Sequence, residues 1–346
     1  MWQLRNLTPF GVERAFTRDR EGAEVWQVAA CCSFHVDAAG RVDIAEPCDV
    51  PLLAPEYAEC AGGHLLVRDT DFALARTRTD VLVEGDAIAP GGRPCTAMDV
   101  AVAVGGVEKR LRIVGDRVAD ARGESPPPAP FDRMPITFAR ALGGPDPAAA
   151  PGREHPATAA NPVGCGLAAA SRELAGRPLP NVAYVSAAEA ARAEGAPAGL
   201  GPIAPHWSSR RRWAGTYDET WRRLRAPLVP TDLDDRFFQA APPDQWTATP
   251  LVGGEPVRVI GMTEEGRWSF VLPRVVLSAT VHFTRRRTTV LRFAMSSVRI
   301  DTRSRRIHLG FLASHTCHAD VLELVDTVVR FKPVRRLWPA PVRVPA

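Results

Sequence analysis

The sequence predicts a mainly β protein, in which antiparallel, strand-rich regions near both ends of the chain carry a proline-rich middle segment packed on them. Short runs of β-branched and aromatic residues, separated by turn residues, fill residues 1–121 and 257–346. Residues 122–256 differ, because 21 of the 32 prolines lie between Pro126 and Pro256, and proline interrupts both helices and central strands. Large aromatic residues, which disordered segments lack, also occur there. We therefore expect ordered loops and short helices in the middle region; one compact domain built from all three regions is the alternative division.

The first region contains the clearest strand signals. An apolar run at residues 25–36 predicts a long strand. Two further runs, 97–104 and 107–114, are joined by Gly105 and Gly106, and such a link favours a tight hairpin because its turn requires positive φ. The second of these runs alternates polar and apolar residues, so one of its faces is expected to contact water. A meander of this kind predicts antiparallel pairing.

The middle region contains two short helices by its sequence pattern. An alanine-rich stretch predicts a weak helix at 187–194, and acidic residues followed by arginines predict a better one from Tyr217 to Leu224. Thr216 is the expected N-cap of that second helix. Asp232 is expected to cap a further short turn at 235–238.

The last region returns to short β-branched runs. A valine-rich stretch at 322–331 favours a strand over a helix, and Arg285–Arg287 is expected to form a turn. The remaining predicted strands of this region are residues 257–260, 267–272, 275–283, 288–295, 298–301 and 307–312.

Composition is typical of a globular protein and argues against a nucleic-acid partner. Hydrophobic residues make up 45% and charged residues 24% of the chain. The net charge is only +4, and Lys109 and Lys332 are the only lysines among 43 basic residues. We interpret the arginine excess as a solvated surface suited to protein contacts, and not as a nucleic-acid footprint.

No segment of the sequence indicates export or membrane insertion. The first residues lack the basic start, apolar run and cleavage site of a secretion signal, and no later stretch is apolar and long enough to span a bilayer. The seven cysteines are scattered, without the two-residue spacing of zinc or redox sites. We therefore expect free thiols and a cytoplasmic location.

Several residues have ligand or catalytic chemistry, although their spacing does not require it. His315, Cys317 and His318 are possible metal ligands, but neighbouring strand residues point to opposite faces, and ordinary strand and loop roles are favoured. Cys165 lies between glycines, as a nucleophile does, and would need His206 as its base. For both groups the structural interpretation is preferred.

The remaining candidate residues would form either an acid–base site or a phosphate-binding site. Asp218, Asp232 and Asp234 would form an acid–base site with His206 only if the fold brought them together. The segment Gly199–Gly201 lacks the strand–loop–helix order of a phosphate loop. Arginine runs at residues 210–212 and 285–287 favour solvated turns or ion pairs between proteins over phosphate contacts. The sequence therefore predicts no catalytic residue, no metal site and no cofactor.

Short blocks follow one another in order over roughly residues 1 to 275. They include Asn6–Phe10 at the start, Asn161–Gly166 in the middle and, most strongly, the stretch from Gly199 to Pro242. Each block is weak alone, and their number and order carry the comparison. Together they resemble the bacterial type VI secretion adaptor family, whose members are encoded beside a VgrG spike protein and a toxic effector. Cys165 departs from the resemblance, because a basic residue is more usual there.

The resemblance implies that the matching positions are structural or partner-binding residues. These positions are Asn6, Thr8, Pro9, Asp80, Gly85, Asn161, Pro162, Gly164, Gly166, Pro180, Asn181, Gly199, Gly201, Pro202, Trp207, Arg210, Gly215, Thr216, Tyr217, Asp218, Trp221, Arg225, Pro230, Asp232 and Phe238.

As a function, the resemblance implies a cytoplasmic adaptor or chaperone that binds one effector and helps load it onto the VgrG spike. Its partners would be these two proteins, without nucleic acid, membrane insertion or enzymatic activity. Two alternatives stay open: a structural component of the secreted spike assembly, and an enzyme. The enzyme's site would lie near His206, Asp218, Asp232 and Cys165.

The aromatic and arginine residues of the strongest block are expected to stabilise the fold, since large side chains of this kind are usually buried or paired. The expected buried residues are Trp207, Tyr217 and Trp221. The expected ion pairs join Arg210 or Arg225 to a carboxylate such as Asp218 or Asp232.

Overall fold

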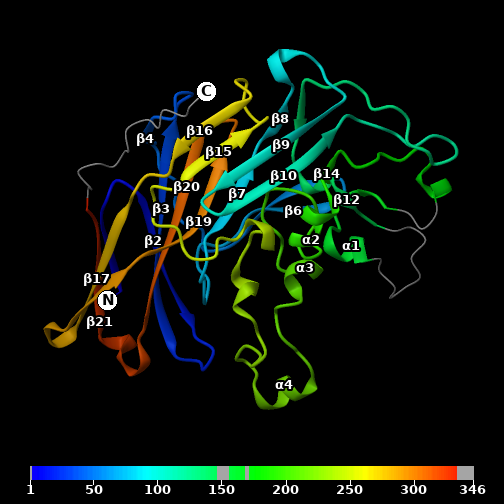
Figure 1. Ribbon diagram of the computed structural model, residues 1–346. Coiled ribbons are helices and arrows are strands. Elements are labelled where there is room, and N and C mark those ends of the chain that lie inside the picture. Colours follow the sequence, from blue (N-terminus) through cyan, green and yellow to red (C-terminus); the bar gives the residue numbers. More distant parts are fainter. Residues whose placement is uncertain (1, 146–155, 168–170, 333–346) are drawn as a thin grey trace.

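The computed structural model describes residues 2–145, 156–167 and 171–332 (Figure 1). Strands make up 42% and helices 14%, and the sheets are mainly antiparallel with few short helices. The fold class that the sequence predicts is therefore confirmed. In this part of the chain, no helix is both long enough and apolar enough to cross a membrane.

The largest sheet forms the centre of the molecule and takes strands from both ends of the chain. Its two longest strands, β3 and β20, pair antiparallel along most of their length, and β7 joins the edge of the sheet in parallel with β19. In spatial order the strands are β2 (Gly11–Arg18), β3 (Glu24–Val36), β20 (Arg306–Thr316), β19 (Ala294–Asp301) and β7 (Asp80–Glu84), with β4 (Val42–Ile44) added to β3.

Two smaller sheets pack on one face of this central sheet. The five-stranded one contains the hairpin predicted at Gly105 and Gly106, which is confirmed by the pairing of Val104 with Val107. Its order is β14 (Val182–Tyr184), β10 (Val107–Val114), β9 (Ala97–Val104), β15 (Pro256–Ile260) and β16 (Arg267–Val271). The four-stranded one has the order β1 (Gln3–Leu7), β21 (Leu324–Lys332), β17 (Val276–Phe283) and β18 (Thr288–Arg292).

The hydrophobic core is continuous because β3 contacts both smaller sheets with one face. Alternate residues of a strand share a face, and Trp26 and Val28 pack against the four-stranded sheet. Further along the same face, Cys32 and Phe34 pack in the core shared with the five-stranded sheet. A single strand thus links the two halves of the core.

Residues 47–79 and the proline-rich middle cover the opposite face of the central sheet. Leu82 on β7 packs there with Trp213 and Trp246 of the middle region, and Gln27 on β3 donates to the carbonyl of Ala73 at 2.7 Å. The remaining strands are β5 (Glu56–Cys60), β6 (Gly63–Arg68), β8 (Asp86–Ile88), β11 (Arg133–Pro135), β12 (Leu142–Gly143) and β13 (Cys165–Gly166). The helices are α1 (Pro156–Ala160), α2 (Ala187–Arg192), α3 (Ser208–Arg211) and α4 (Glu219–Leu224).

Helix α4 and the 3₁₀ turn at residues 235–238 both exist, but each has a different N-cap residue from the one that the sequence predicts. Asp218 caps α4 by accepting from the Trp221 amide at 2.7 Å. The expected cap, Thr216, donates its hydroxyl to Asp232 at 2.7 Å instead. That bond also removes Asp232 from its expected role, and Asp234 caps the 3₁₀ turn that follows it. In each case the carboxylate two residues further along the chain accepts the capping hydrogen bond.

Candidate functional site

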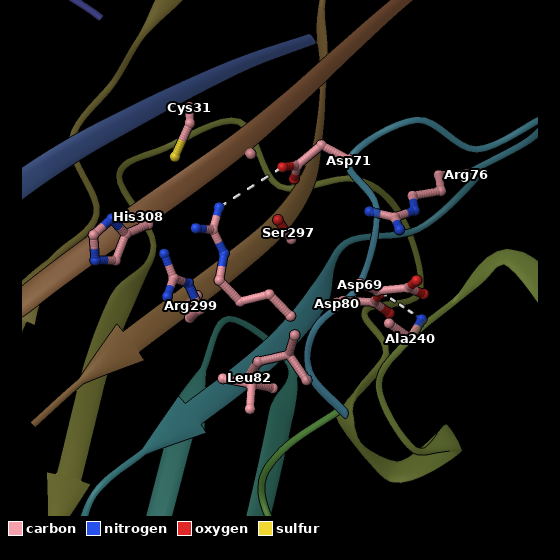
Figure 2. Close-up of a pocket in the computed structure, with 13 residues that line it drawn as sticks. Cys31, Asp69, Asp71, Arg76, Asp80, Leu82, Ala240, Ser297, Arg299 and His308 are labelled. Atoms are coloured by element: carbon pink, nitrogen blue, oxygen red, sulfur yellow. Dashed lines mark hydrogen bonds and ion pairs between the residues drawn. The ribbon is translucent and has the colours of Figure 1, made fainter. Parts of the chain in front are cut away.

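A small polar cavity lies between the central sheet and the loop that follows β6. Cys31, Arg299 and His308 reach it from neighbouring strands, and Asp71 and Arg76 line it from the loop (Figure 2). Its volume is about 40 Å³, which is room for only about three water molecules. As it stands, the cavity can hold charged side chains and water, but not a partner segment or a large substrate.

Asp49 is the centre of the charge network at one end of this cavity. Its carboxylate accepts from Arg299 Nη2 at 2.5 Å and lies 3.2 Å from His308 Nδ1 and 3.7 Å from Arg68 Nη1. Burial acts to raise the pKa of Asp49, but His308, when it is protonated in acid, and the permanently charged Arg299 lower it below its ordinary value. Ser33 Oγ contacts His308 Nδ1 at 2.9 Å and so orients the ring. The carboxylate is ionised and shared by two guanidinium groups.

Cys31, Asp49 and His308 place three potential metal-ligand atoms within 4.8 Å of one another. Burial and the nearby Asp71 raise the pKa of the Cys31 thiol to about 12, so it stays protonated. Burial and the Arg299 charge lower the pKa of His308 to about 4, so its ring is neutral at pH 7. A protonated thiol is a poor nucleophile, and a divalent cation would meet the guanidinium that already holds the carboxylate. We interpret the cluster as a structural charge network.

The sequence pattern gave little indication of this cavity. Cys31 lies within the apolar run of β3, and His308 lies within a β-branched run, so both resemble ordinary strand residues. The only local signal was the density of charged residues between Arg68 and Asp80. Which of these side chains meet depends on the pairing of β3, β20, β19 and β7.

The motif residues at the edges of the central sheet make structural contacts. Asp80 begins β7 and is buried, and its carboxylate accepts from Gln239 Nε2 and from the Ala240 amide, both at 2.8 Å. Burial raises the pKa of Asp80. A Cβ on Gly85 would lie 2.0 Å from Thr302 Oγ1. The motif residues before β2 form one turn: Asn6, Thr8 and Pro9.

A second set of motif residues fastens two loops beside the five-stranded sheet. Asn161 donates to two loop carbonyls at 2.9 and 3.0 Å, and a Cβ on Gly164 would lie 2.4 Å from its side-chain nitrogen. Asn181 donates to the last carbonyl of β10 at 3.0 Å. These contacts leave no space for larger residues, so they explain the residue types. The other members of these loops are Pro162, Gly166 and Pro180.

Trp207 and Arg210 hold the next motif block against the body of the protein. Trp207 is 0% exposed and packs edge-to-face on Phe138, with ring centres 5.3 Å apart. Arg210 is 5% exposed and donates to two carbonyls at 2.8 and 2.9 Å. Its ion pair is with Asp69, at 2.8 Å. The burial of Trp207 and the pairing of Arg210 with a carboxylate were predicted correctly, but that carboxylate is Asp69 and not Asp218 or Asp232. The solvated turn expected at residues 210–212 is wrong for Arg210, whereas Arg211 and Arg212 are exposed. The neighbouring motif residues are Gly199, Gly201, Pro202 and Phe238.

Residues 215–230 form a projecting segment around α4, which we call the α4 lobe (Figure 1). Its base is closed at Gly215, where φ is +80° and a Cβ would lie 2.8 Å from the side chain of Pro230. Arg225 fastens the lobe to the β2–β3 turn, because it donates to the carbonyl of Arg20 at 2.5 Å and pairs with Glu21 at 3.2 Å. Trp221 Nε1 donates to a lobe carbonyl at 2.9 Å.

Large apolar side chains of the α4 lobe contact water. Tyr217 is 56% exposed and Leu224 is 74% exposed, while Trp221 is half-buried. Tyr217 and Trp221 pack mainly on each other, edge-to-face at 4.7 Å. The expected burial of Tyr217 is therefore wrong, because the lobe is too thin to enclose its ring, whereas the expected burial of Trp221 is confirmed in part. Arg225 pairs with a carboxylate as expected, but that carboxylate is Glu21, because Asp218 caps α4 and Asp232 accepts from Thr216.

The residues of the enzyme alternative make separate local contacts. Asp218 caps α4 and Asp232 accepts from Thr216. His206 is exposed just before α3, and Cys165 is half-buried on β13, where burial raises the pKa of its thiol. All four lie within the described part of the chain, and no hydrogen bond or ion pair there joins any two of them. His315, Cys317 and His318 likewise form no group of converging ligand atoms among the described residues.

The comparison with known families matches most of the described chain. A family model described as an uncharacterized protein conserved in bacteria (DUF2169) matches residues 21–311. The chain belongs to this family. In this DUF2169 protein the matched part contains β3, the first half of β20, the polar cavity and the α4 lobe. No curated protein and no solved structure matches the chain.

Proposed function

We propose that this protein is a cytoplasmic adaptor that binds one type VI secretion effector and helps load it onto the VgrG spike. Two supports come from the sequence: the ordered blocks that resemble the adaptor family, and membership of a bacterial family. The observation that carries the proposal is the α4 lobe, because it presents large apolar side chains on a fastened projection.

The α4 lobe has the composition of a binding surface. At its base, Thr216 donates a hydrogen bond to Asp232, and Arg225 donates one to the carbonyl of Arg20, so these groups are already paired. Its tip exposes Tyr217 and Leu224 beside arginines. Tyrosine, tryptophan and arginine are the residues that contribute most to protein interfaces. A projection that is fixed in shape also loses little conformational entropy when a partner binds.

The polar cavity favours binding over catalysis as the role of the chain. It has a volume of about 40 Å³, whereas small-molecule sites are typically about 300–1,000 Å³. Its thiol is protonated and its imidazole is neutral at pH 7, as the pKa values of Cys31 and His308 indicate. A binding protein acts by mass action, and it stabilises the loading-competent effector only as far as it prefers that form.

Co-purification tests the proposal. The protein is co-expressed with the effector and the VgrG protein encoded beside it, and capture of the effector is measured for wild type and for Leu224→Asp on the α4 lobe. The matched control is Leu322→Asp, because Leu322 is 71% exposed on the 3₁₀ helix η7 (His318–Glu323), close to the exposure of Leu224. We expect Leu224→Asp to lose the effector and the control to keep it. Failure of the wild-type protein to retain that effector would overturn the function.

A delivery assay separates the adaptor from the enzyme. Deletion of the gene should abolish delivery of one effector while the secretion system still fires. The double variant His206→Ala, Cys165→Ala should deliver normally if its melting temperature is unchanged. Normal effector binding with failed delivery by that variant would require a chemical step and would favour the enzyme instead.

A further inference from the structure

The four-stranded sheet turns one of its faces toward solvent, although Val328 in the middle of that face is buried. Its inner face carries Ala279 and Val281, which pack against Trp26 in the core. Alternate residues point to the other side, and there Leu7 and Val290 are more than half exposed. We call this side the outer face of the four-stranded sheet; Figure 1 shows β17 and β21, two of its strands, at the margin of the molecule.

Four cations lie on this outer face. The register places Ser278 between Arg330 and Arg292 on neighbouring strands, and Arg5 and Lys332 lie on the same face by their position in β1 and β21. All four cations are exposed. Within the described residues, none of them makes a side-chain hydrogen bond or an ion pair with another group.

The charge of this face is strongly biased. Its one carboxylate among the described residues is Asp326, which contacts His282 Nδ1 at 2.5 Å. The net charge of the whole chain is only +4, so four unpaired cations give this face a higher density of positive charge than the surface has on average. Strand spacing and rise put them within roughly 14 Å by 14 Å. A field of this sign raises the local concentration of acidic groups and speeds their encounter with the surface.

We propose that the outer face of the four-stranded sheet binds an acidic protein surface. Carboxylates would pair with Arg292 and Arg330 without breaking an existing ion pair, since neither has one. Leu7, Val276 and Val290 lie among the cations and are exposed, so the partner carries apolar side chains between its acidic ones. Charged groups around apolar contacts are the usual composition of an interface rim.

The composition of the face favours protein over nucleic acid. Proteins that bind single-stranded nucleic acids stack the bases on aromatic rings. No Phe, Tyr or Trp lies on this outer face among the described residues. Asp326 would repel phosphate, whereas a protein partner can place a donor beside it. This inference does not depend on the adaptor proposal, because the face lies on strands outside the α4 lobe.

Fluorescence anisotropy with the intact protein tests the inference. The probe is a fluorescein-labelled peptide of alternating Glu and Val; the comparison probes are the same peptide with Lys in place of Glu, a single-stranded oligonucleotide and phosphatidylserine vesicles. The face variant is Arg292→Glu, Arg330→Glu. The control is Arg93→Glu, Arg122→Glu in loops outside both this face and the α4 lobe, which changes the same charge at exposed positions.

We expect the wild-type protein to prefer the Glu–Val peptide and the face variant to bind it about tenfold more weakly. The control should bind as the wild type does, and added salt should weaken all binding. Should the face variant not fold, as judged by circular dichroism, Arg292→Ala with Arg330→Ala replaces it. The inference is overturned if the peptide does not bind, if both double variants weaken it equally, or if the oligonucleotide or the vesicles bind more tightly.

Discussion

Replacing Arg210 with alanine tests whether buried charge holds the proline-rich region on the loop that follows β6. The Arg210 guanidinium is 5% exposed, pairs with Asp69 at 2.8 Å and donates to two carbonyls. Alanine removes these contacts together. The Asp69 carboxylate, whose side chain is 7% exposed, then stays in a low-dielectric site without its counter-ion.

The size of the effect follows from this geometry. Breaking a buried ion pair by removing one partner costs about 3–5 kcal/mol. The entropy of unfolding is about 2.1 cal/mol/K per residue, which for 346 residues is roughly 0.7 kcal/mol/K. A loss of about 4 kcal/mol therefore lowers the melting temperature by about 5 °C, if the chain unfolds in one transition.

Calorimetry and urea denaturation measure this loss, and a nearby arginine supplies the control. Arg212 pairs with Glu194 at 2.7 Å, but both side chains are largely exposed, so Arg212→Ala should cost less than about 1 kcal/mol. A double-mutant cycle with Asp69→Ala isolates the pair. Equal losses for Arg210→Ala and Arg212→Ala, or additive losses in the cycle, would refute the reasoning.

Three further changes have expected outcomes that equilibrium unfolding in urea can check. Trp207→Ala should cost about 3–5 kcal/mol because the ring is fully buried, and Trp221→Ala should cost clearly less; equal costs would contradict the burial. Between pH 6.5 and about 4, His308 should contribute a loss of about 3 kcal/mol to the wild type's stability, because there the unfolded His308 gains a proton that the folded ring, with its pKa lowered to about 4, does not. His308→Gln should flatten that slope. Lys109→Met should cost about 3–5 kcal/mol by leaving the buried Asp244, 3.0 Å away, unpaired, and adding Asp244→Leu should restore most of it.

The sequence was sufficient for features that depend on near neighbours. The hairpin at Gly105 and Gly106 needed only two alternating runs and a tight turn. The long strand β3 needed only an unbroken apolar run, and β21 only its valines. These signals lie within a dozen residues, so the chain itself supplies the context.

Features that depend on distant partners were not predictable in the same way. Lys109 shares the buried face of β10 with Leu111, and its counter-ion Asp244 comes from another region of the chain. Nothing near Tyr217 in sequence distinguishes an exposed aromatic from a buried one. Its exposure follows from the thickness of the α4 lobe, which is a tertiary property.

The pairing of β1 with β21 and of β3 with β20 determines when these sheets can form during synthesis. Both pairs join strands that lie far apart in sequence, so neither sheet is complete until the ribosome has made β20 and β21. During synthesis the apolar run of β3 waits for its neighbour, and such non-local pairing folds slowly. The unpaired edges of β1 and β3 are therefore the parts of the nascent chain most exposed to aggregation until β20 and β21 have been made.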